Sequence, residues 1–422
     1  MDNRPAHPGG LMIYTGVCAM TKIAILGYGT VGGGVARVLD VNPAQVAASA
    51  GEEVALGAIL DLREFPGDPH EALVTHDYRT ILEDPSITVI AETMGGVKPA
   101  YEFTKQALEA GKSVCTSNKE LVAKHGPELL KIAAEHHVSY LFEASVGGGI
   151  PILRTLAGAL KSEQIDEITG ILNGTTNYIL TKMEQDGAAF DDVLKKAQEL
   201  GYAERDPSAD IEGHDACRKI AILGSLMTGG YVAPDAVPTE GITAITAADL
   251  AGARACGMAV KLLGNCRMTG EGLEISVAPY LIAAEHPLAS VNGVFNAVAV
   301  HGNMLGTSMY YGQGAGRDAT ASAVVADICE IVRNAGRTVP VSMTEKPAQL
   351  APMGDATRRF FVRVGREHEA EVLEAFAESR TICTEQGEAC ILTGPVRESE
   401  FLEKLGGIAG VRNRIRVLDD ED

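Results

Sequence analysis

A glycine-rich turn between an apolar run and a helical segment constrains this chain most. Lys22–Leu26 is a short apolar run, Gly27–Gly34 follows it directly, and Val35–Leu39 then has the spacing of an amphipathic helix. In such a motif the first glycine permits a tight turn, the second lets a pyrophosphate approach the backbone, and the third lets helix and strand pack closely. The pattern predicts a dinucleotide bound at the N-terminus of the helix. The three motif positions are Gly27, Gly29 and Gly32.

Strand candidates and helical stretches alternate along the first third of the chain. This alternation predicts an α/β fold, with a doubly wound parallel sheet of the Rossmann type over residues 21–150. A later helical stretch, Ala319–Asn334, is predicted to return to this domain. Residues 1–20 are expected to form a disordered extension. The further predicted strands are Val54–Leu60, Val89–Ala91, Ser113–Cys115 and Val138–Phe142, and the helices between them are Pro99–Ala110 and Glu128–His136.

Beyond Gly149 the pattern changes to longer helices with fewer strands. Residues 151–318 are expected to form an α+β domain for substrate binding, catalysis and oligomerisation, with the strand pair Glu167–Leu172 and Leu273–Pro279. The prolines of residues 341–355 indicate a linker. Residues 356–422 follow the order strand, helix, two strands, helix, strand, which is ferredoxin-like. The predicted helices of the middle domain are Pro151–Leu160, Thr176–Gln185, Phe190–Leu200 and His214–Met227.

The acidic composition excludes several classes of partner. A formal charge of -20 repels nucleic-acid phosphates and anionic lipid, and the absence of Trp argues against a stacking platform for single strands. No apolar run reaches the roughly 18 residues of a membrane-spanning helix. The eight cysteines are scattered without a C-x-x-C pair or metal-ligand spacing, as is typical of reduced thiols. We therefore expect a cytoplasmic protein without nucleic-acid or membrane partners.

Two residues at the end of the second predicted strand bear on the choice of dinucleotide. Asp61 closes that strand, where an acidic side chain hydrogen-bonds a ribose 2′-hydroxyl and favours NAD. Arg63 follows it and is suited to holding the 2′-phosphate of NADP instead. Asp61 also lies further past Gly32 than the usual spacing of about 20 residues. Both cofactors therefore stay open.

The densest polar cluster of the chain spans residues 201–219. Asp215 and Lys219 lie four residues apart, so on a helix they share a face. Ile222 and Leu226 continue the same stripe with apolar side chains. This pattern indicates a charged pair that faces the protein or a cleft. The alternative is an exposed ion pair, which contributes little stability.

The chemistry of hydride transfer explains why such a cluster would be needed. Reduction of an aldehyde leaves an alkoxide that must receive a proton, and a lysine whose pKa is lowered by burial can supply it. Carboxylates such as Glu204 and Asp215 suit an ammonium group on the substrate. The acidic loop Glu204–Asp210 and the isolated Lys119 also favour a site over a surface ion pair.

With these residues in view, the sequence resembles the homoserine dehydrogenases over nearly its whole length. The resemblance implies reversible, NAD(P)-dependent interconversion of L-aspartate 4-semialdehyde and L-homoserine, on the route to threonine, methionine and isoleucine. The motifs are specific as a set, whereas one alone would not be. The matching stretches are residues 27–34, 117–119, 142–151, 173–177, 204–219, 312–316 and 320–322.

The resemblance also implies roles for single residues. It implies Lys219 as the proton donor and Lys119 as a second catalytic lysine near the nicotinamide. Glu204 and Asp215 are implied as contacts of the substrate's amino and hydroxyl groups, with Asp210 supporting them. Besides Lys119 and the glycine turn, the implied cofactor contacts are Thr30, Val31, Thr93 and Gly316.

A sodium ion is implied in the same way. Members of the family often hold this ion in the loop that starts at Glu143, mostly through backbone carbonyls. Oxygen-only ligation suits a hard cation, and a glycine-rich loop can turn its carbonyls inward. The implied ligands are Glu143, Val146, Gly148 and Ile150.

The tail, from about Arg359, resembles an ACT domain, which in this family would bind an amino acid such as threonine for feedback control. It departs from the usual pattern, because Gly365–His368 stands where an Asp-x-Pro-Gly turn is expected. Sensing of an effector and assembly of subunits, as a homodimer or homotetramer, both stay open.

Two other functions compete with this interpretation. The first is a dehydrogenase for another small amino-acid substrate, although its acylating type needs an activated cysteine that the sequence does not indicate. The second is a non-catalytic sensor of a dinucleotide and an amino acid. Proton donors such as Lys119 and Lys219 have no use in a sensor, which argues against it.

Overall fold

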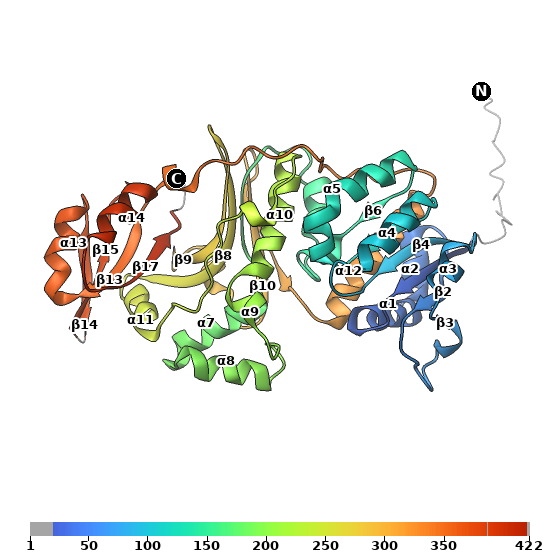
Figure 1. The fold of residues 1–422 in the computed structure, drawn as a ribbon, viewed down its shortest axis with the longest axis horizontal. Coiled ribbons are helices and arrows are strands. Elements are labelled where there is room, and N and C mark those ends of the chain that lie inside the picture. Colours follow the sequence, from blue (N-terminus) through green and yellow to red (C-terminus); the bar gives the residue numbers. More distant parts are fainter. Residues whose placement is uncertain (1–19, 386, 420–422) are drawn as a thin grey trace, which may run out of the picture.

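The computed structural model describes residues 20–385 and 387–419, and its N-terminal part is built on a six-stranded parallel sheet (Figure 1). The strand order β3-β2-β1-β4-β5-β6 is that of a Rossmann fold, so the predicted α/β class and doubly wound parallel sheet are confirmed. Of the predicted extension only Met20 is described, and it begins the first strand. The strands are β1 (Met20–Leu26), β2 (Glu53–Leu60), β3 (Val74–Thr75), β4 (Ile87–Glu92), β5 (Ser113–Thr116) and β6 (Tyr140–Leu141).

Both faces of this sheet are covered, because successive residues of a strand point to opposite sides. Ile23 and Ile25 pack with the helices of one face, and Ala24 and Leu26 with those of the other. The first face is covered by α1 (Thr30–Val41), α2 (Pro43–Ala50) and α12 (Arg317–Arg333), and the second by α3 (Tyr78–Leu82), α4 (Ala100–Glu109) and α5 (Lys119–Glu135). Helix α12 comes from late in the chain and lies beside α1 (Figure 1).

Helix α5 corrects the prediction that a helix begins at Glu128. It runs from Lys119 to Glu135 and contains Pro127. A proline inside a helix removes the amide that would bond the carbonyl four residues earlier, which is why the sequence favoured a start after it. Here the hydroxyl of Tyr231 donates to the Ala123 carbonyl at 3.1 Å and replaces the missing amide. The longer helix places Lys119 at its first turn.

A second, nine-stranded sheet runs through the rest of the molecule in the order β11-β10-β7-β8-β9-β17-β13-β15-β14. The predicted strands Glu167–Leu172 and Leu273–Pro279 both lie in it but do not pair, because β8 separates them. The long run of β9 is buried on both faces, so it lacks the alternation that marks a strand in sequence. Its strands before the tail are β7 (Ile165–Ile171), β8 (Met258–Thr269), β9 (Gly272–Ala283), β10 (Phe295–Gly302) and β11 (Gly306–Gln313).

Helices on this second sheet carry most of the polar motifs. Helix α10 packs across β8 and β9, and α7 packs on β8 and β10. Figure 1 shows α7, α8 and α9 below α10. The helices are α6 (Ile152–Ala157), α7 (Gly174–Asp186), α8 (Phe190–Glu199), α9 (Ser208–Ile211), α10 (His214–Thr228) and α11 (Ala247–Ala255).

The tail continues the second sheet, where the sequence suggested a module with a sheet of its own. Residues Arg416 and Val417 pair in parallel with Tyr280 and Leu281 of β9. The tail follows the predicted order strand, helix, two strands, helix, strand. These elements are β13 (Phe360–Gly365), α13 (Glu369–Ala375), β14 (Arg380–Glu385), β15 (Glu388–Leu392), α14 (Glu398–Gly406) and β17 (Val411–Val417).

Two buried ionic networks hold the tail on the second sheet. Arg416 donates to Glu398 in the tail at 2.5 Å and to Glu240 outside it at 2.8 Å. Arg363 donates to Asp249 of α11 at 2.8 Å. Arg416 and Glu398 are almost wholly buried. Their ion pair therefore holds the seam, the contact between the tail and the rest of the second sheet, in one defined arrangement.

Within the described residues, no helix combines the length and apolar content needed to cross a membrane. The cysteines in that part of the chain all carry free thiols.

Candidate active site

The glycine turn joins β1 to α1 with very little space around it. Gly27 has φ +90°, a backbone conformation that favours glycine. A Cβ on Gly32 would lie 2.1 Å from the Gly27 carbonyl oxygen, so only glycine lets the helix approach. A Cβ on Gly29, in contrast, would meet no atom within 4 Å. The turn is therefore closed on the protein side and open on the outer side, where a pyrophosphate would lie.

The first turn of α1 faces this open side. Gly29 caps the helix, no acidic residue lies in its first turn, and Thr30 and Val31 are at least partly accessible. Unpaired amides and the positive end of the helix dipole suit a phosphate there. The Thr93 hydroxyl donates to the Gly27 carbonyl at 2.7 Å and ties the turn to the end of β4.

Gly316 lies at the start of α12, the helix that packs on α1. It caps that helix with φ +116°. A Cβ on Gly34 would lie 2.9 Å from Ala321 and 3.0 Å from the Arg317 carbonyl oxygen, so α1 and α12 touch at their first turns. The structure thus brings Gly316 to the same end of the sheet as the glycine turn.

Asp61 and Arg63, the two candidates for cofactor choice, bind each other. The Arg63 guanidinium donates twice to the Asp61 carboxylate, at 2.9 Å from each nitrogen. The same carboxylate accepts the Tyr28 amide of the glycine turn at 2.8 Å. These bonds hold the pKa of Asp61 well below its usual range, with Arg63 as the main cause. The Arg63 side chain is 61% exposed and stacks over Phe65, so it can reach a ligand at the surface.

A single carboxylate, that of Asp215, joins the two predicted lysines. Lys119 Nζ lies 2.8 Å from Asp215 Oδ1, and Lys219 Nζ lies 2.8 Å from Oδ2. Lys219 also donates to the Leu172 carbonyl at 2.7 Å. Asp215 and Lys219 are 5% and 7% exposed, so the stripe on α10 faces inward and is not a surface ion pair.

Burial separates the protonation behaviour of the two lysines. Burial lowers the pKa of Lys219, and the adjacent Asp215 carboxylate only partly offsets this. For Lys119, whose side chain is 37% exposed, the attraction of Asp215 outweighs burial and raises the pKa. Burial alone would raise the pKa of Asp215, but the two ammonium groups hold it well below its usual range. Of the two lysines, Lys219 is therefore the one that gives up a proton more easily.

Asn173 holds two carboxylates of this cluster by hydrogen bonds. From the sequence it was identified only as part of a motif shared with the family. Its side-chain amide donates to Asp210 at 2.7 Å and to Asp215 at 2.9 Å. Its oxygen accepts the Thr176 amide and so caps α7. Burial and the nearby Asp215 raise the pKa of Asp210. Five polar residues, from α5, α9, α10 and the start of α7, thus converge on one point.

Comparison with known proteins gives matches that extend over most of this chain. A family model described as "Homoserine dehydrogenase, NAD binding domain" matches residues 27–143, and one described as "Homoserine dehydrogenase" matches residues 151–329. A homoserine dehydrogenase of Synechocystis is 45% identical over 361 residues, which are 81% of this chain and 82% of the relative. The chain belongs to the homoserine dehydrogenase family. The resemblance predicted from its motifs is confirmed.

Solved homoserine dehydrogenases share the fold. A crystal structure from Thiobacillus denitrificans superposes with a TM-score of 0.86 at 35% identity, covering 95% of this chain and 99% of that one. A hyperthermophilic archaeal homoserine dehydrogenase in complex with NADPH gives a TM-score of 0.64 at 29% identity, covering 77% of this chain and 100% of that one. The predictions of an NAD(P) cofactor and of an oxidoreductase acting on a CH–OH group are confirmed by this family membership.

Glu204 is the predicted substrate residue that the structure does not bring into the cluster. It is exposed in the loop between α8 and α9. Its backbone carbonyl accepts the Gln198 side-chain amide at 3.0 Å. Among the described residues its carboxylate makes no hydrogen bond or ion pair with Asp210, Asp215 or the lysines.

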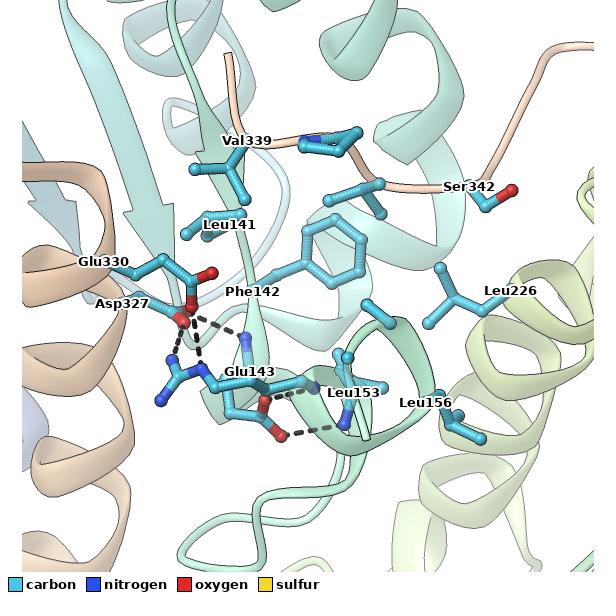
Figure 2. Close-up of a pocket in the computed structure, with 15 residues that line it drawn as sticks. Leu141, Phe142, Glu143, Leu153, Leu156, Leu226, Asp327, Glu330, Val339 and Ser342 are labelled. Carbon is cyan, nitrogen blue, oxygen red and sulfur yellow. Dashed lines mark hydrogen bonds and ion pairs between the residues drawn. The ribbon is translucent and has the colours of Figure 1, made fainter. Parts of the chain in front are cut away.

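The loop predicted to hold sodium, residues 143–150, starts at Glu143, whose side chain is buried. Glu143 accepts the amides of Leu153 and Arg154 at 2.9 and 2.6 Å and so caps α6 (Figure 2). Its own amide donates to Asp327 of α12 at 2.9 Å. Burial raises the pKa of Glu143. Glu143 therefore holds α6 through its side chain and α12 through its amide, and its backbone carbonyl is the atom that the predicted cation site would use.

The rest of that loop is folded tightly against the 312–316 motif. Gly148 has φ +58°, and a Cβ on it would lie 2.4 Å from the Gly314 carbonyl oxygen. The Ile150 carbonyl accepts the Ile152 amide at 2.9 Å, which leaves one lone pair for a cation. Among the described residues no three His, Cys, Asp or Glu side chains gather as a metal site, so any ion here would depend on carbonyls such as that of Val146.

A cavity of about 240 Å³ lies beside this junction and apart from the lysine cluster. Figure 2 shows its walls as largely apolar, with the charged side chains gathered at one end. Arg154 pairs there with Asp327 at 2.7 Å and with Glu330 at 2.8 Å. The labelled apolar residues around it are Leu141, Phe142, Leu153, Leu156, Leu226 and Val339.

Proposed function

We propose that this chain catalyses the reversible NAD(P)-dependent reduction of L-aspartate 4-semialdehyde to L-homoserine, with Lys219 as the proton donor. The observation that carries this assignment of roles is the Asp215 carboxylate held at 2.8 Å from two lysines of different protonation behaviour. When bound, the nicotinamide supplies or accepts the hydride. The reaction then needs one proton moved at the substrate oxygen, and a buried lysine suits that task.

Lys219 is suited to proton transfer because burial favours its neutral form. During reduction its ammonium donates a proton to the developing alkoxide, and during oxidation its amine takes the proton back. Asp215 holds the lysine in place and balances its charge. Lys119 stays charged under the influence of Asp215, so its role is to stabilise negative charge at the substrate oxygen.

The substrate ammonium is proposed to lie against the carboxylates of this cluster. Asp210 and Asp215 are held side by side through Asn173, which suits a cation between them. Glu204 lies in the exposed loop before Asp210 and would have to turn inward on binding. A loop position is compatible with such a movement.

The cofactor contacts proposed from the sequence lie around the open side of the glycine turn. Thr30, Val31 and Thr93 would hold the pyrophosphate and the adjacent ribose, and Gly316 would border them from α12. We propose that Arg63 determines the preference between NAD and NADP. The Asp61 carboxylate already accepts hydrogen bonds from Arg63 and from the Tyr28 amide, so it is not free for a ribose hydroxyl. A 2′-phosphate can replace Asp61 as the partner of Arg63, which favours NADP.

The sodium ion remains a proposal supported by the loop geometry. Carbonyls of Glu143, Val146, Gly148 and Ile150 would be its ligands, and it would stiffen the junction between the sheets. Exchange of sodium for choline in the buffer should lower the unfolding temperature if the ion is structural. An unfolding temperature that is the same in both buffers would argue against it.

For the tail we propose an ACT-like module in a cytoplasmic homodimer or homotetramer. Its element order supports the ACT-like assignment, and the residues 365–368 in place of the usual turn leave effector binding and assembly as competing roles. Threonine added to the assay separates them, because inhibition supports sensing. No response, together with loss of the oligomer on removal of the tail, supports assembly.

The decisive test compares two buried lysines. Purified enzyme is assayed with homoserine and with each dinucleotide by nicotinamide absorbance, and the failure of both cofactors would reject the function. Lys219→Ala should lower kcat by about 10²–10⁴-fold. Lys261→Met is the control, because the Lys261 ammonium contacts only carbonyl oxygens away from the cluster and should affect stability alone. Nearly full kcat in Lys219→Ala would remove Lys219 from the mechanism.

A further inference from the structure

A buried carboxyl group at the cofactor edge of the first sheet has no part in the function proposed above. Glu92 is the last residue of β4 and is fully buried. It pairs with Leu26, the last residue of β1, and with Thr116, the last residue of β5. The strand order reverses between β1 and β4, and ligands of such sheets bind at that point. Glu92 thus lies beneath the place where the nicotinamide end of the cofactor is expected.

A directed chain of hydrogen bonds runs from Glu92 to the start of α5. The Thr116 hydroxyl donates to Glu92 Oε2 at 2.5 Å. The same hydroxyl accepts the amide of Asn118 at 2.9 Å, and Asn118 Oδ1 accepts the Leu121 amide at 3.1 Å as the cap of the helix. Lys119 is the first residue of that helix. The position of its side chain therefore depends on a cap that Glu92 anchors.

The same carboxylate also holds the loop on the cofactor side. Glu92 Oε1 accepts the Met94 amide at 2.7 Å, and Asn118 Nδ2 donates to the Gly96 carbonyl at 2.6 Å. A Cβ on Gly27 would lie 2.8 Å from Met94, so this loop touches the glycine turn. One carboxylate thus connects the loop after β4 with the helix that carries Lys119.

We propose that Glu92 is a positioning residue for the reaction: its carboxylate sets the start of α5, so that the Lys119 ammonium reaches Asp215, and sets the loop after β4 that touches the glycine turn. The proposal rests on the proposed role of the lysine cluster. It concerns a residue that touches neither the cluster nor the glycine turn directly and acts through Thr116 and Met94.

The hydrogen bonds from Thr116 and Met94 are best satisfied by the ionised form of Glu92. Thr116 already accepts the Asn118 amide, so its single proton must point to an acceptor, and the ionised carboxylate also accepts the Met94 amide. Burial raises the pKa of Glu92 to about 7, and its hydrogen bonds only partly offset this. The other titratable groups that face it are the neutral Cys115 of β5 and Tyr140 of β6. Protonation as the pH falls through about 7 should therefore weaken the positioning.

Two shape-preserving variants of the full-length enzyme test this. Glu92→Gln has one acceptor oxygen, so it can accept either the Thr116 hydroxyl or the Met94 amide but not both. Thr116→Val removes the link itself. We expect each to lower kcat by about 10-fold or more, with the KM for homoserine and the Kd for NADPH changed less than about 3-fold. The acid limb of kcat near pH 7 in the wild type should be absent in Glu92→Gln.

The double variant and a matched control make the test specific. Because both residues act in one chain, Glu92→Gln with Thr116→Val should be no worse than the poorer single variant. Thr104→Val is the control, since Thr104 is also fully buried and its hydroxyl has no hydrogen-bond partner among the described residues. Its kcat should match the wild type.

Several results would overturn the proposal. These are unchanged kcat in Glu92→Gln, additive losses in the double variant, or an acid limb that persists without the carboxylate. If Glu92→Gln does not fold, the same kcat, KM and pH readouts on Thr116→Val decide. Absence of turnover in the wild type would instead reject the proposed function, so the two failures are distinguishable.

Discussion

At the scale of single residues, the site depends on one carboxylate shared by two ammonium groups. Asp215 contacts Lys119 and Lys219 at equal distances, yet the lysines differ in burial and hence in pKa direction. Two like groups with different environments are a common way to divide the tasks of charge stabilisation and proton transfer. The division that we propose here would follow from the position of Lys219 inside α10 and of Lys119 at a partly exposed helix start.

The pH dependence of the oxidation reaction tests this division. Lys219 acts as a base only when neutral, and burial lowers its pKa below the ordinary value of about 10.4. We expect kcat/KM for homoserine oxidation to rise as the pH increases through that lowered pKa, and the reduction to fall over the same interval. Asp215→Asn should move the limb to lower pH, because Asp215 raises the pKa of Lys219.

The control for this experiment is Asp206→Asn, which alters an exposed carboxylate that only accepts bonds from Ser208 nearby. Its pH profile should superpose on that of the wild type. A limb that shifts to higher pH in Asp215→Asn would contradict the electrostatic account.

Cofactor preference is a second prediction at this scale. Arg63→Ala should weaken binding of NADPH by about tenfold, because a charge-assisted bond to the 2′-phosphate is lost. Binding of NADH should change less than about twofold, since NADH has no such phosphate. The Kd of each is measured by nicotinamide fluorescence. Equal losses for both would mean that Arg63 serves only to hold Asp61.

At the scale of elements, the glycine turn shows how closely packing and binding are combined in one helix start. Gly32 faces the Gly27 carbonyl, whereas Gly29 and Gly33 face open space. Gly32 is therefore needed for packing of the protein itself, whereas Gly29 and Gly33 leave space in which the cofactor can bind. Helix α5 makes a similar point, since Tyr231 from another domain permits Pro127 inside it.

Alanine at the two kinds of glycine should give different defects. Gly32→Ala places a Cβ 2.1 Å from a backbone oxygen and should prevent stable folding. Gly29→Ala meets no protein atom within 4 Å and should leave the unfolding temperature almost unchanged, but it should weaken dinucleotide binding at least tenfold. Thermal unfolding and NADPH titration measure both. Normal NADPH affinity in Gly29→Ala would contradict the proposed pyrophosphate position.

At the scale of the whole molecule, the tail and the substrate domain form one mechanical unit. Their strands share a sheet, and the seam is closed by Arg358 and Arg416 on buried carboxylates. Arg358 also pairs with Glu274 of β9. The tail is thus anchored on β9, the strand on which α10 also packs.

The stability of this seam is the corresponding prediction. Arg416→Met leaves the Glu398 carboxylate buried without its closest partner, and it should lower the free energy of unfolding by about 3–5 kcal/mol. Arg397→Met, which breaks an exposed pair with Asp355, should cost less than about 1 kcal/mol. Urea unfolding of both variants measures the difference. Equal costs would show that the buried network does not hold the tail.

Much of the first domain could be predicted because its signals are local. The turn at Gly27, the apolar strand before it and the order of strands and helices depend on short-range sterics and periodicity. Helical spacing placed Asp215 and Lys219 on one face but left an exposed ion pair open, and the acidic loop and Lys119 then favoured a site. The second sheet was harder, because β9 is buried on both faces and shows no alternation, and because β8 enters between two strands that the sequence paired.

By itself, then, the sequence determined the dinucleotide fold, the family and the shared helical face of Asp215 and Lys219. Only the tertiary structure decided that Lys119 shares Asp215 with Lys219, that Asp61 and Arg63 bind each other, and that Glu92 lies beneath the cofactor edge. The physical reason is distance along the chain. Periodicity and turn chemistry act over a few residues, whereas the burial and pairing of a charge depend on elements that meet only when the sheets are complete.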